Sequence, residues 1–225
     1  MGDIIRLALE TPCAIGGKRL VFAHPDDPSL VIKVMRPEFG AGGLRTEPLW
    51  ARLVRRYHFS TSLLRELREQ VKLRFEGDSY PRFLSPILAF VDTDLGPGLV
   101  SRAARDERGG FAPTLKALID RGGVDERVLA DLERFCASVR ASSIVVGDLN
   151  IGNIVHAYDP VEGPHFVLID GVGDKTFVPL LRISGFLSRR AKNRKIARLM
   201  KAVRREYSRP VRQAEPPLAQ TLQFD

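Results

Sequence analysis

The sequence predicts an α+β fold in which antiparallel strands come first and helices dominate the second half. Short runs rich in β-branched and aromatic residues occur over 20–35 and 83–103, with turn-forming residues between them. Apolar residues then recur at helical spacing over 125–141 and over 184–207. The polar, glycine-containing stretch 105–110 separates the two halves, so we expect the boundary between two lobes there.

Length and composition are those of a folded protein. The chain has 225 residues, of which 44% are apolar and 28% charged, enough for one domain or two small lobes. Its net charge of +8 suits a phosphate-rich partner. Cys13 and Cys136 form no metal-binding or disulfide pattern. We expect lobes at 1–104 and 105–209, followed by a flexible, proline-containing tail at 210–225.

No apolar run approaches the length of a transmembrane helix, and the N-terminus has no signal-peptide core. With its unpaired cysteines, the chain is therefore expected to be a cytoplasmic protein without a transmembrane segment.

The first strands are predicted at Leu20–Ala23 and Leu30–Met35, which form a hairpin around the proline- and aspartate-rich turn 24–28. The second strand is apolar except for Lys33. A lysine in such a run is either at a sheet edge, where it reaches water, or paired inside. The residues alone leave both readings open.

A helix is predicted within 46–75, because apolar residues repeat there at four-residue spacing. Glu66 and Glu69 flank this stripe. Two more strands, 83–93 and 99–103, are predicted around the turn 94–98. The members of the predicted apolar stripe are Leu63, Leu67, Val71 and Phe75.

The second half begins with a short helix at 114–121 that Gly122 and Gly123 end, and a longer one at 125–141. Two strands, 154–158 and 165–169, then form a hairpin that ends on Asp170.

Three oxygen-bearing side chains are expected to gather beside this hairpin. Asp148 and Asn153 are five residues apart in a loop, and the hairpin brings Asp170 back to that loop. Carboxylate and amide oxygens suit Mg²⁺, and phosphoryl transfer needs such ligands together with a carboxylate that orients the attacking group. The pattern therefore predicts an ATP and magnesium site.

The segment Val146–Val155 resembles the catalytic loop of protein kinases and, more closely, the Gly-Asp-Leu-x-x-x-Asn-Ile loop of aminoglycoside and choline phosphotransferases. Leu168–Gly171 resembles their metal-binding strand. The resemblance implies a protein-kinase-like two-lobe fold, with a mainly antiparallel sheet in the N-lobe and a compact, truncated helical C-lobe. It implies ATP and Mg²⁺ as cofactors, Asp148 as the catalytic residue, and Asn153 and Asp170 as metal ligands.

Val31–Lys33 resembles the third-strand lysine motif of kinases, which implies that Lys33 contacts ATP phosphates and pairs with a helical glutamate. Glu66 is the candidate and Glu69 the alternative, although Glu66 also fits an exposed helix residue with local partners. Gly16 and Gly17 stand where kinases have a glycine-rich nucleotide loop. In one interpretation they bind the nucleotide, and Lys18 or Arg19 adds positive charge there. In the other they form an ordinary turn.

More closely, most of the chain resembles the bacterial PhoP regulatory network proteins of YrbL type, which implies an ATP-binding fold of unknown substrate. The motifs at 24–27, 64–67, 112–115 and 176–180 carry this resemblance together with the catalytic loop.

Two positions depart from the kinase pattern: Val146 replaces the usual histidine and Asn150 the usual lysine. We expect an ATP- and Mg²⁺-dependent phosphotransferase whose small-molecule or protein acceptor is unknown. The alternatives are a nucleotide-binding pseudokinase with a regulatory role, or a protein that binds polyanions through its basic helix.

That basic helix is predicted at 184–207, where nine lysines and arginines accompany a helical apolar stripe. It is read as docked on the second lobe with a solvated cationic face. The other readings are contact with nucleic acid or with an anionic membrane surface.

Overall fold

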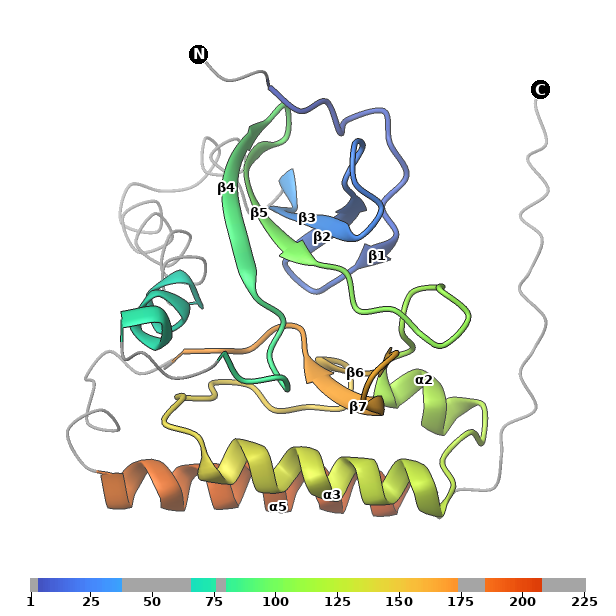
Figure 1. The fold of residues 1–225 in the computed structure, drawn as a ribbon, viewed down its shortest axis with the longest axis vertical. Coiled ribbons are helices and arrows are strands. Elements are labelled where there is room, and N and C mark those ends of the chain that lie inside the picture. Colours follow the sequence, from blue (N-terminus) through green and yellow to red (C-terminus); the bar gives the residue numbers. More distant parts are fainter. Residues whose placement is uncertain (1–3, 38–65, 76–79, 174–184, 208–225) are drawn as a thin grey trace, which may run out of the picture.

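The structure is a computed structural model that describes residues 4–37, 66–75, 80–173 and 185–207. Within these ranges the fold is α+β, as predicted. A five-stranded antiparallel sheet forms the N-terminal part, and a two-stranded sheet packs with helices in the C-terminal part (Figure 1). The predicted features at 46–65, 176–180 and 210–225 lie outside the described residues.

The N-terminal sheet has the strand order β1-β2-β3-β5-β4, and every neighbouring pair is antiparallel. The hairpin that the sequence predicts over 20–35 is confirmed, and the two strands predicted around the turn 94–98 pair with each other. The strands are β1 Ala14–Ile15, β2 Arg19–Ala23, β3 Leu30–Met35, β4 Ile87–Thr93 and β5 Gly96–Arg102.

Strand β3 lies in the middle of this sheet, between β2 and β5. Lys33 is therefore not on an edge strand, and the interpretation in which it reaches water from a sheet edge is wrong. Lys33 is only 7% exposed. A buried lysine needs partners within the protein, so its surroundings bear directly on the site.

Strand β4 starts at Ile87 rather than at Phe83, where the sequence predicts it. The preceding residues pair with the C-terminal part instead: the Leu168 amide donates to the Phe83 carbonyl at 2.7 Å, and the Ser85 amide donates to the Leu168 carbonyl at 3.1 Å. Pro86 follows and has no amide hydrogen to donate to a strand. The segment before β4 thus joins the two parts of the molecule.

The C-terminal part contains the predicted hairpin and all three predicted helices. Thr114 and Asp125 cap the first two helices, their side chains accepting from the Ala117 and Val128 amides. Gly122, with a φ of 68°, follows the first helix as expected. The elements are β6 Ile154–Asp159, β7 Gly163–Leu168, α2 Leu115–Asp120, α3 Glu126–Ala141 and α5 Gly185–Tyr207.

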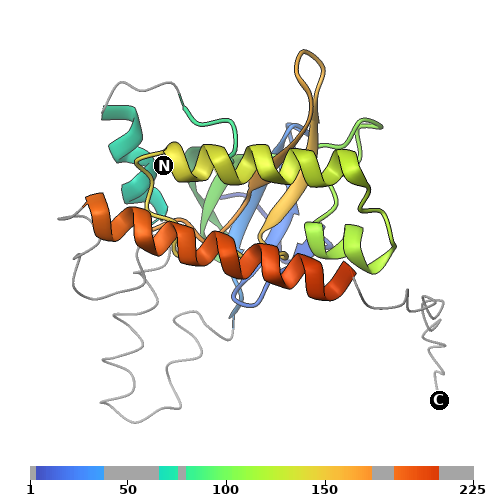
Figure 2. The same ribbon diagram turned by 90° about the horizontal axis from the view of Figure 1, so that it is seen from below.

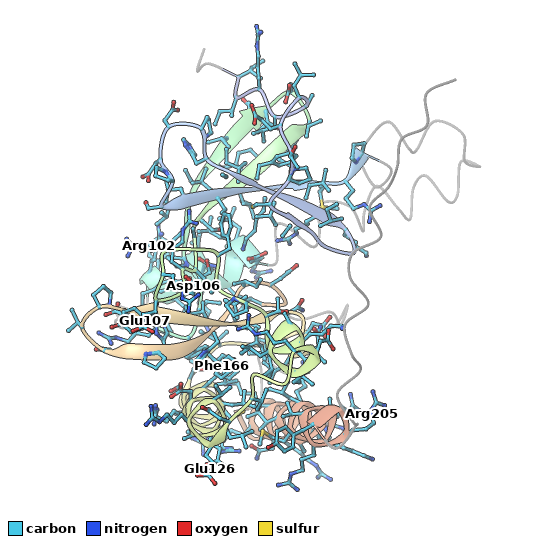
Figure 3. The ribbon with its side chains drawn as sticks, turned by 90° about the vertical axis from the view of Figure 1, so that its right-hand side faces the viewer. Arg102, Asp106, Glu107, Glu126, Phe166 and Arg205 are labelled. Carbon is cyan, nitrogen blue, oxygen red and sulfur yellow. The ribbon has the colours of Figure 1, made fainter. Side chains whose placement is uncertain are left out.

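Helices α3 and α5 lie side by side beneath the β6–β7 hairpin (Figures 1 and 2). Phe135 of α3 contacts the hairpin and the segment before β4, with ring-centroid distances of 6.3 Å to Phe166 of β7 and 6.0 Å to Phe83. Figure 3 shows Phe166 at this junction. Other buried members of the same core are Leu132, Ile154, Leu168, Ile196, Leu199 and Val203.

The helix that includes residues 66–75 presents a face that the sequence does not predict. Val71 and Phe75, from the predicted apolar stripe, are 41% and 87% exposed. Glu66, Glu69 and Gln70 are buried instead, with Leu73 on the same face. The predicted stripe is therefore wrong for the described residues, and the polar side chains point inward because they have partners there.

Gln70 ties this helix to the start of β4. Its amide nitrogen donates to the Ser85 carbonyl at 3.0 Å, and its Oε1 accepts from the Ile87 amide at 2.6 Å. Arg74 adds a hydrogen bond to the Ile87 carbonyl at 2.6 Å. These bonds fix the helix against the sheet and so fix the position of Glu66 one turn before.

Among the helices in the described part of the chain, none has both the length and the apolar composition needed to cross a membrane.

Replacing Gln70 by leucine tests the polar face. The change leaves the buried Ile87 amide without its acceptor and removes one of two donors to the Ser85 carbonyl. We therefore expect the free energy of unfolding to fall by about 2–3 kcal/mol in urea denaturation. Val71→Ala on the exposed side is the matched control and should change it by less than about 0.5 kcal/mol. Equal losses in the two variants would contradict this assignment.

Candidate functional site

The loop from Asp148 to Asn153 is shaped by its own side chains. Asn150 Oδ1 accepts from the Gly152 amide at 2.8 Å and from the Asn153 amide at 3.2 Å. The amide nitrogen of Asn153 donates back to the Asp148 carbonyl at 3.3 Å. The Asn153 amide nitrogen is thus used within the loop, while its Oδ1 is an oxygen of the kind that binds Mg²⁺.

These contacts give a local reason for two departures from the kinase pattern. Asn150 serves as the acceptor that closes the loop, a role that asparagine fills well in turns and that a lysine, which has no acceptor, cannot take. Val146 is 2% exposed and packs in the C-terminal core. Apolar packing thus occupies the position at which kinases have a histidine.

The backbone brings Asp170 beside this loop, as the sequence predicts. The Gly147 and Asp148 amides both donate to the Gly171 carbonyl, at 2.7 Å and 2.9 Å. The Ile169 amide donates to the Asn153 carbonyl at 2.9 Å. The residue before Asp170 and the residue after it are therefore both hydrogen-bonded to the loop that carries Asp148 and Asn153.

Two glycines permit this close approach. A Cβ on Gly147 would overlap the Gly173 carbonyl oxygen, and a Cβ on Gly171 would overlap that of Asp148. Gly171 also has a φ of 92°, which side-chain-bearing residues rarely adopt. The glycine before Asp148 and the glycine after Asp170 are thus required by backbone contact.

Lys33 extends from the sheet to the same place. Its Nζ donates to the Ile169 carbonyl at 2.7 Å, directly before Asp170. Burial lowers the pKa of Lys33, Glu66 raises it in opposition, Arg19 lowers it further and Asp170 raises it. Both carboxylates therefore favour the charged ammonium at the site.

Glu66 is not exposed, and its side chain is only 3% accessible. Its closest ionic partner, however, is Arg19: the arginine Nη1 donates to Glu66 Oε2 at 2.6 Å. The expected direct Lys33–Glu66 ion pair is therefore wrong in this structure, since Lys33 donates to Ile169 instead. Glu66 still acts on Lys33 through its charge.

The sequence offers Arg19 only as one of two possible sources of charge beside the Gly16–Gly17 turn, and its pairing with Glu66 was not predicted. Its side chain is 7% accessible, and its Nη1 lies 3.9 Å from Asp170 Oδ1 as well as beside Glu66. Glu66 and Asp170 raise the pKa of Arg19 against the opposing effect of burial. A polar residue at the first position of an otherwise apolar strand was the available signal.

Gly16 and Gly17 form the turn that leads into Arg19. The Gly16 amide donates to the Arg19 carbonyl at 2.8 Å. A Cβ on Gly17 would meet no atom within 4 Å, so packing within the described chain does not require glycine there. The nucleotide-binding role of this turn remains a prediction.

The site contains two carboxylates and one amide, of which the Asp170 carboxylate and the Asn153 amide oxygen are the predicted metal ligands. In the described ranges, no three side chains of the His, Cys, Asp or Glu type form a group that could hold a metal ion. Asp170 Oδ1 accepts from the Gly171 amide at 2.6 Å, and its side chain is 46% accessible. A metal would therefore need the Asn153 oxygen or ligands from a bound nucleotide.

One of the comparisons with known proteins identifies a family. The family model described as PhoP regulatory network protein YrbL matches residues 5–204. None of the curated proteins compared with the chain matches it. One solved structure, described as a co-crystal structure of WbdD and the kinase inhibitor LY294002, is similar with a TM-score of 0.41 and 13% identity. The similarity covers 85% of this chain and 49% of that one, so the chain spans about half its length.

The glycine contacts can be tested by Gly171→Ala. The new Cβ would overlap the Asp148 carbonyl, so we expect the free energy of unfolding to fall by about 2 kcal/mol or more. Gly163→Ala is the matched control, because Gly163 has a φ of 79° but open space around it. It should lose only about 1 kcal/mol for the backbone conformation. Equal losses would contradict the close approach.

The Arg19–Glu66 pair can be tested by a double-mutant cycle. Removing either partner leaves the other charge buried, so Arg19→Met and Glu66→Met should each cost about 3 kcal/mol of unfolding free energy. The double variant should lose at least about 1.5 kcal/mol less than the sum.

The exposed pair Lys116–Asp120, at 2.5 Å with side chains 59% and 57% accessible, is the control for this cycle. Its coupling should stay within about 0.5 kcal/mol. Additive losses for Arg19 and Glu66 would argue against a shared buried interaction.

Proposed function

The chain belongs to the family of PhoP regulatory network protein YrbL, and we propose that it is a kinase-like phosphotransferase that uses ATP and Mg²⁺. One observation carries the proposal: the main-chain bonds of Gly171 and Ile169 hold Asp170 against the loop of Asp148 and Asn153. Lys33 reaches the same point from the central strand of the other sheet. These contacts support the proposal that two carboxylates, an amide oxygen and an ammonium group act together, the set that phosphoryl transfer needs.

Each of these side chains has a role in the proposal. Asn153 Oδ1 and the Asp170 carboxylate are the protein oxygens that would hold Mg²⁺. Lys33 and Arg19 provide positive charge for the phosphates of ATP. Glu66 is hydrogen-bonded to Arg19, and its charge opposes the lowering of the Lys33 pKa by burial. When bound, Mg²⁺ neutralises negative charge on the phosphates.

Asp148 is the proposed catalytic residue. Asp148 orients the acceptor hydroxyl toward the γ-phosphoryl group of ATP and accepts its proton. The acceptor oxygen forms a bond to phosphorus, the bond between phosphorus and the bridging oxygen breaks, and ADP leaves with the bonding electrons. Its amide is bonded to Gly171, so the main chain that carries Asp148 is fixed relative to Asp170. The acceptor is a hydroxyl compound or a protein hydroxyl whose identity these residues do not define.

A second candidate is a nucleotide-binding regulatory protein without phosphotransferase activity. Asn150 favours it, because this side chain closes the loop on itself where kinases have a lysine for the transferred phosphate. Such a protein would keep the nucleotide and metal contacts of Lys33, Asn153 and Asp170 but would lack turnover.

Nucleotide binding can be tested by thermal unfolding with Mg²⁺ and ATP. With ATP about a hundredfold above its Kd, we expect the Tm of the parent protein to rise by about 5 °C or more. Asp170→Asn and Lys33→Met should abolish most of the rise, and Asp92→Asn, on the exposed side of β4, should retain it. The absence of a shift in the parent protein would exclude both candidates.

Turnover separates the two candidates. If the chain is a phosphotransferase, Mg²⁺-dependent release of ADP in the presence of hydroxyl compounds should fall about a hundredfold in Asp148→Asn, while ATP still raises the Tm of that variant. Binding without ADP release above background, or release that Asp148→Asn leaves unchanged, would rule out the enzyme and support the regulatory protein.

A further inference from the structure

Helix α5 has its apolar side committed to the protein core. Ile196, Leu199 and Val203 are at most 4% exposed and belong to the same core as α3 and the β6–β7 hairpin. This confirms the docked position that the sequence predicts. It also means that this apolar side is not available to enter a lipid bilayer.

The lysines and arginines of α5 are divided between its two sides. Lys192 and Lys195 point toward the protein, where they donate to the carbonyls of Ser142 and Val146. Burial, together with the charges of Arg189 and Lys72, lowers the pKa of Lys192. The inner lysines therefore attach α5 to the rest of the protein through their hydrogen bonds. The neighbouring positive charges disfavour the charged form of Lys192.

The outer side carries a row of cations. Its members recur at spacings of four, four, three and four residues, which places them on one face of a helix. They are all exposed, and over α5 the sequence contains a single acidic residue, Glu206. At 1.5 Å per residue the row is about 22 Å long. We call it the cationic row, and it consists of Arg190, Arg194, Arg198, Lys201 and Arg205.

The neighbouring helix shows that this charge is not general to the surface. α3 lies in the same layer (Figure 2) and also exposes arginines, but it alternates them with the exposed Glu126 and Glu133. Figure 3 shows Glu126 and Arg205 at the outside of the two adjacent helices. One helix is thus of mixed charge, whereas the other carries nine lysines and arginines and one glutamate, so the positive potential of this face is concentrated along α5.

We propose that the cationic row binds the phosphate backbone of a nucleic-acid duplex without reading its sequence. Duplex DNA carries one negative charge per about 1.7 Å of its axis when both strands are counted, so a row of about 22 Å has more phosphates within its length than it has cations. Four of its five cations are arginines, whose planar guanidinium matches the phosphate group in two hydrogen bonds. Contacts to phosphates position a protein without specifying bases.

The same observations disfavour a membrane surface. Peripheral helices of that kind bury an apolar face in the lipid, whereas the apolar side of α5 is inside the protein. Between Arg190 and Arg205 the outward positions carry no large apolar side chain that could replace it, since the residues between the cations on that side are small or polar, such as Ala197 and Asn193.

The test is the fluorescence anisotropy of a labelled 20-base-pair DNA duplex with the full chain, over a range of NaCl concentrations. Five phosphate contacts predict that log K falls with log[salt] with a slope of about −4.5. The variant with Arg190, Arg194, Arg198 and Lys201 all changed to Gln keeps good helix formers. We expect it to bind at least tenfold more weakly at 50 mM salt, with a slope near −1.

The matched control changes four exposed arginines outside the row to Gln: Arg6, Arg108, Arg121 and Arg127. It has the same net charge as the row variant and should keep the slope of the parent protein. A second duplex of unrelated sequence should bind within about twofold, and an RNA duplex shows which nucleic acid is preferred. Circular dichroism confirms that both variants are folded.

Three results would overturn the proposal. They are no binding of either duplex at 50 mM salt, equal losses in the row variant and its control, and binding to vesicles containing anionic lipid in the absence of duplex binding. None of these results depends on ATP, so failure here is distinguishable from failure of the phosphotransferase.

Discussion

The contact between the backbones at 145–148 and 171–173 is the constraint on which the rest of the site depends. Two main-chain donors share the Gly171 carbonyl, and the Gly173 amide donates to the Val145 carbonyl. The segments can lie this close only because Gly147 and Gly171 have no side chain. Asp148 belongs to the first of these segments, Asp170 directly precedes the second, and Asn153 is hydrogen-bonded to Asp148 and to Ile169. The main chain therefore largely sets the relative positions of these three residues.

Charge is concentrated where the N-terminal sheet meets this contact. Arg19, Lys33, Glu66 and Asp170 are two cations and two anions, and the first three are buried. Taking such groups out of water is costly unless opposite charges and hydrogen bonds compensate. The Arg19–Glu66 bond and the Lys33–Ile169 bond supply that compensation. Asp170 remains half exposed, and it is the member of the four that is proposed to bind a metal.

The sequence predicts much of this arrangement and misses specific parts of it. The hairpins, α2, α3 and α5 follow from turn residues, caps and apolar spacing, which are local signals. The inward polar face of the helix at 66–75 could not be found in this way, because Glu66 and Gln70 are buried by partners at Arg19 and Ile87, distant in sequence. Whether Lys33 lies on an edge strand or on a central strand was ambiguous for the same reason. The order of the strands in the sheet decides this, and the residues of one strand do not determine that order.

The hydrogen bond from Lys33 to Ile169 joins residues 136 positions apart. The five strands of the N-terminal sheet are complete by Arg102, whereas this bond can form only after about seventy further residues have been synthesised. During synthesis from the N-terminus, the sheet can therefore form with the Lys33 ammonium still hydrated. The carbonyl that accepts its hydrogen bond is in place only when the later segment docks. The order of translation thus allows the sheet to form before the charged site assembles. The nascent sheet then need not bury an unpaired charge.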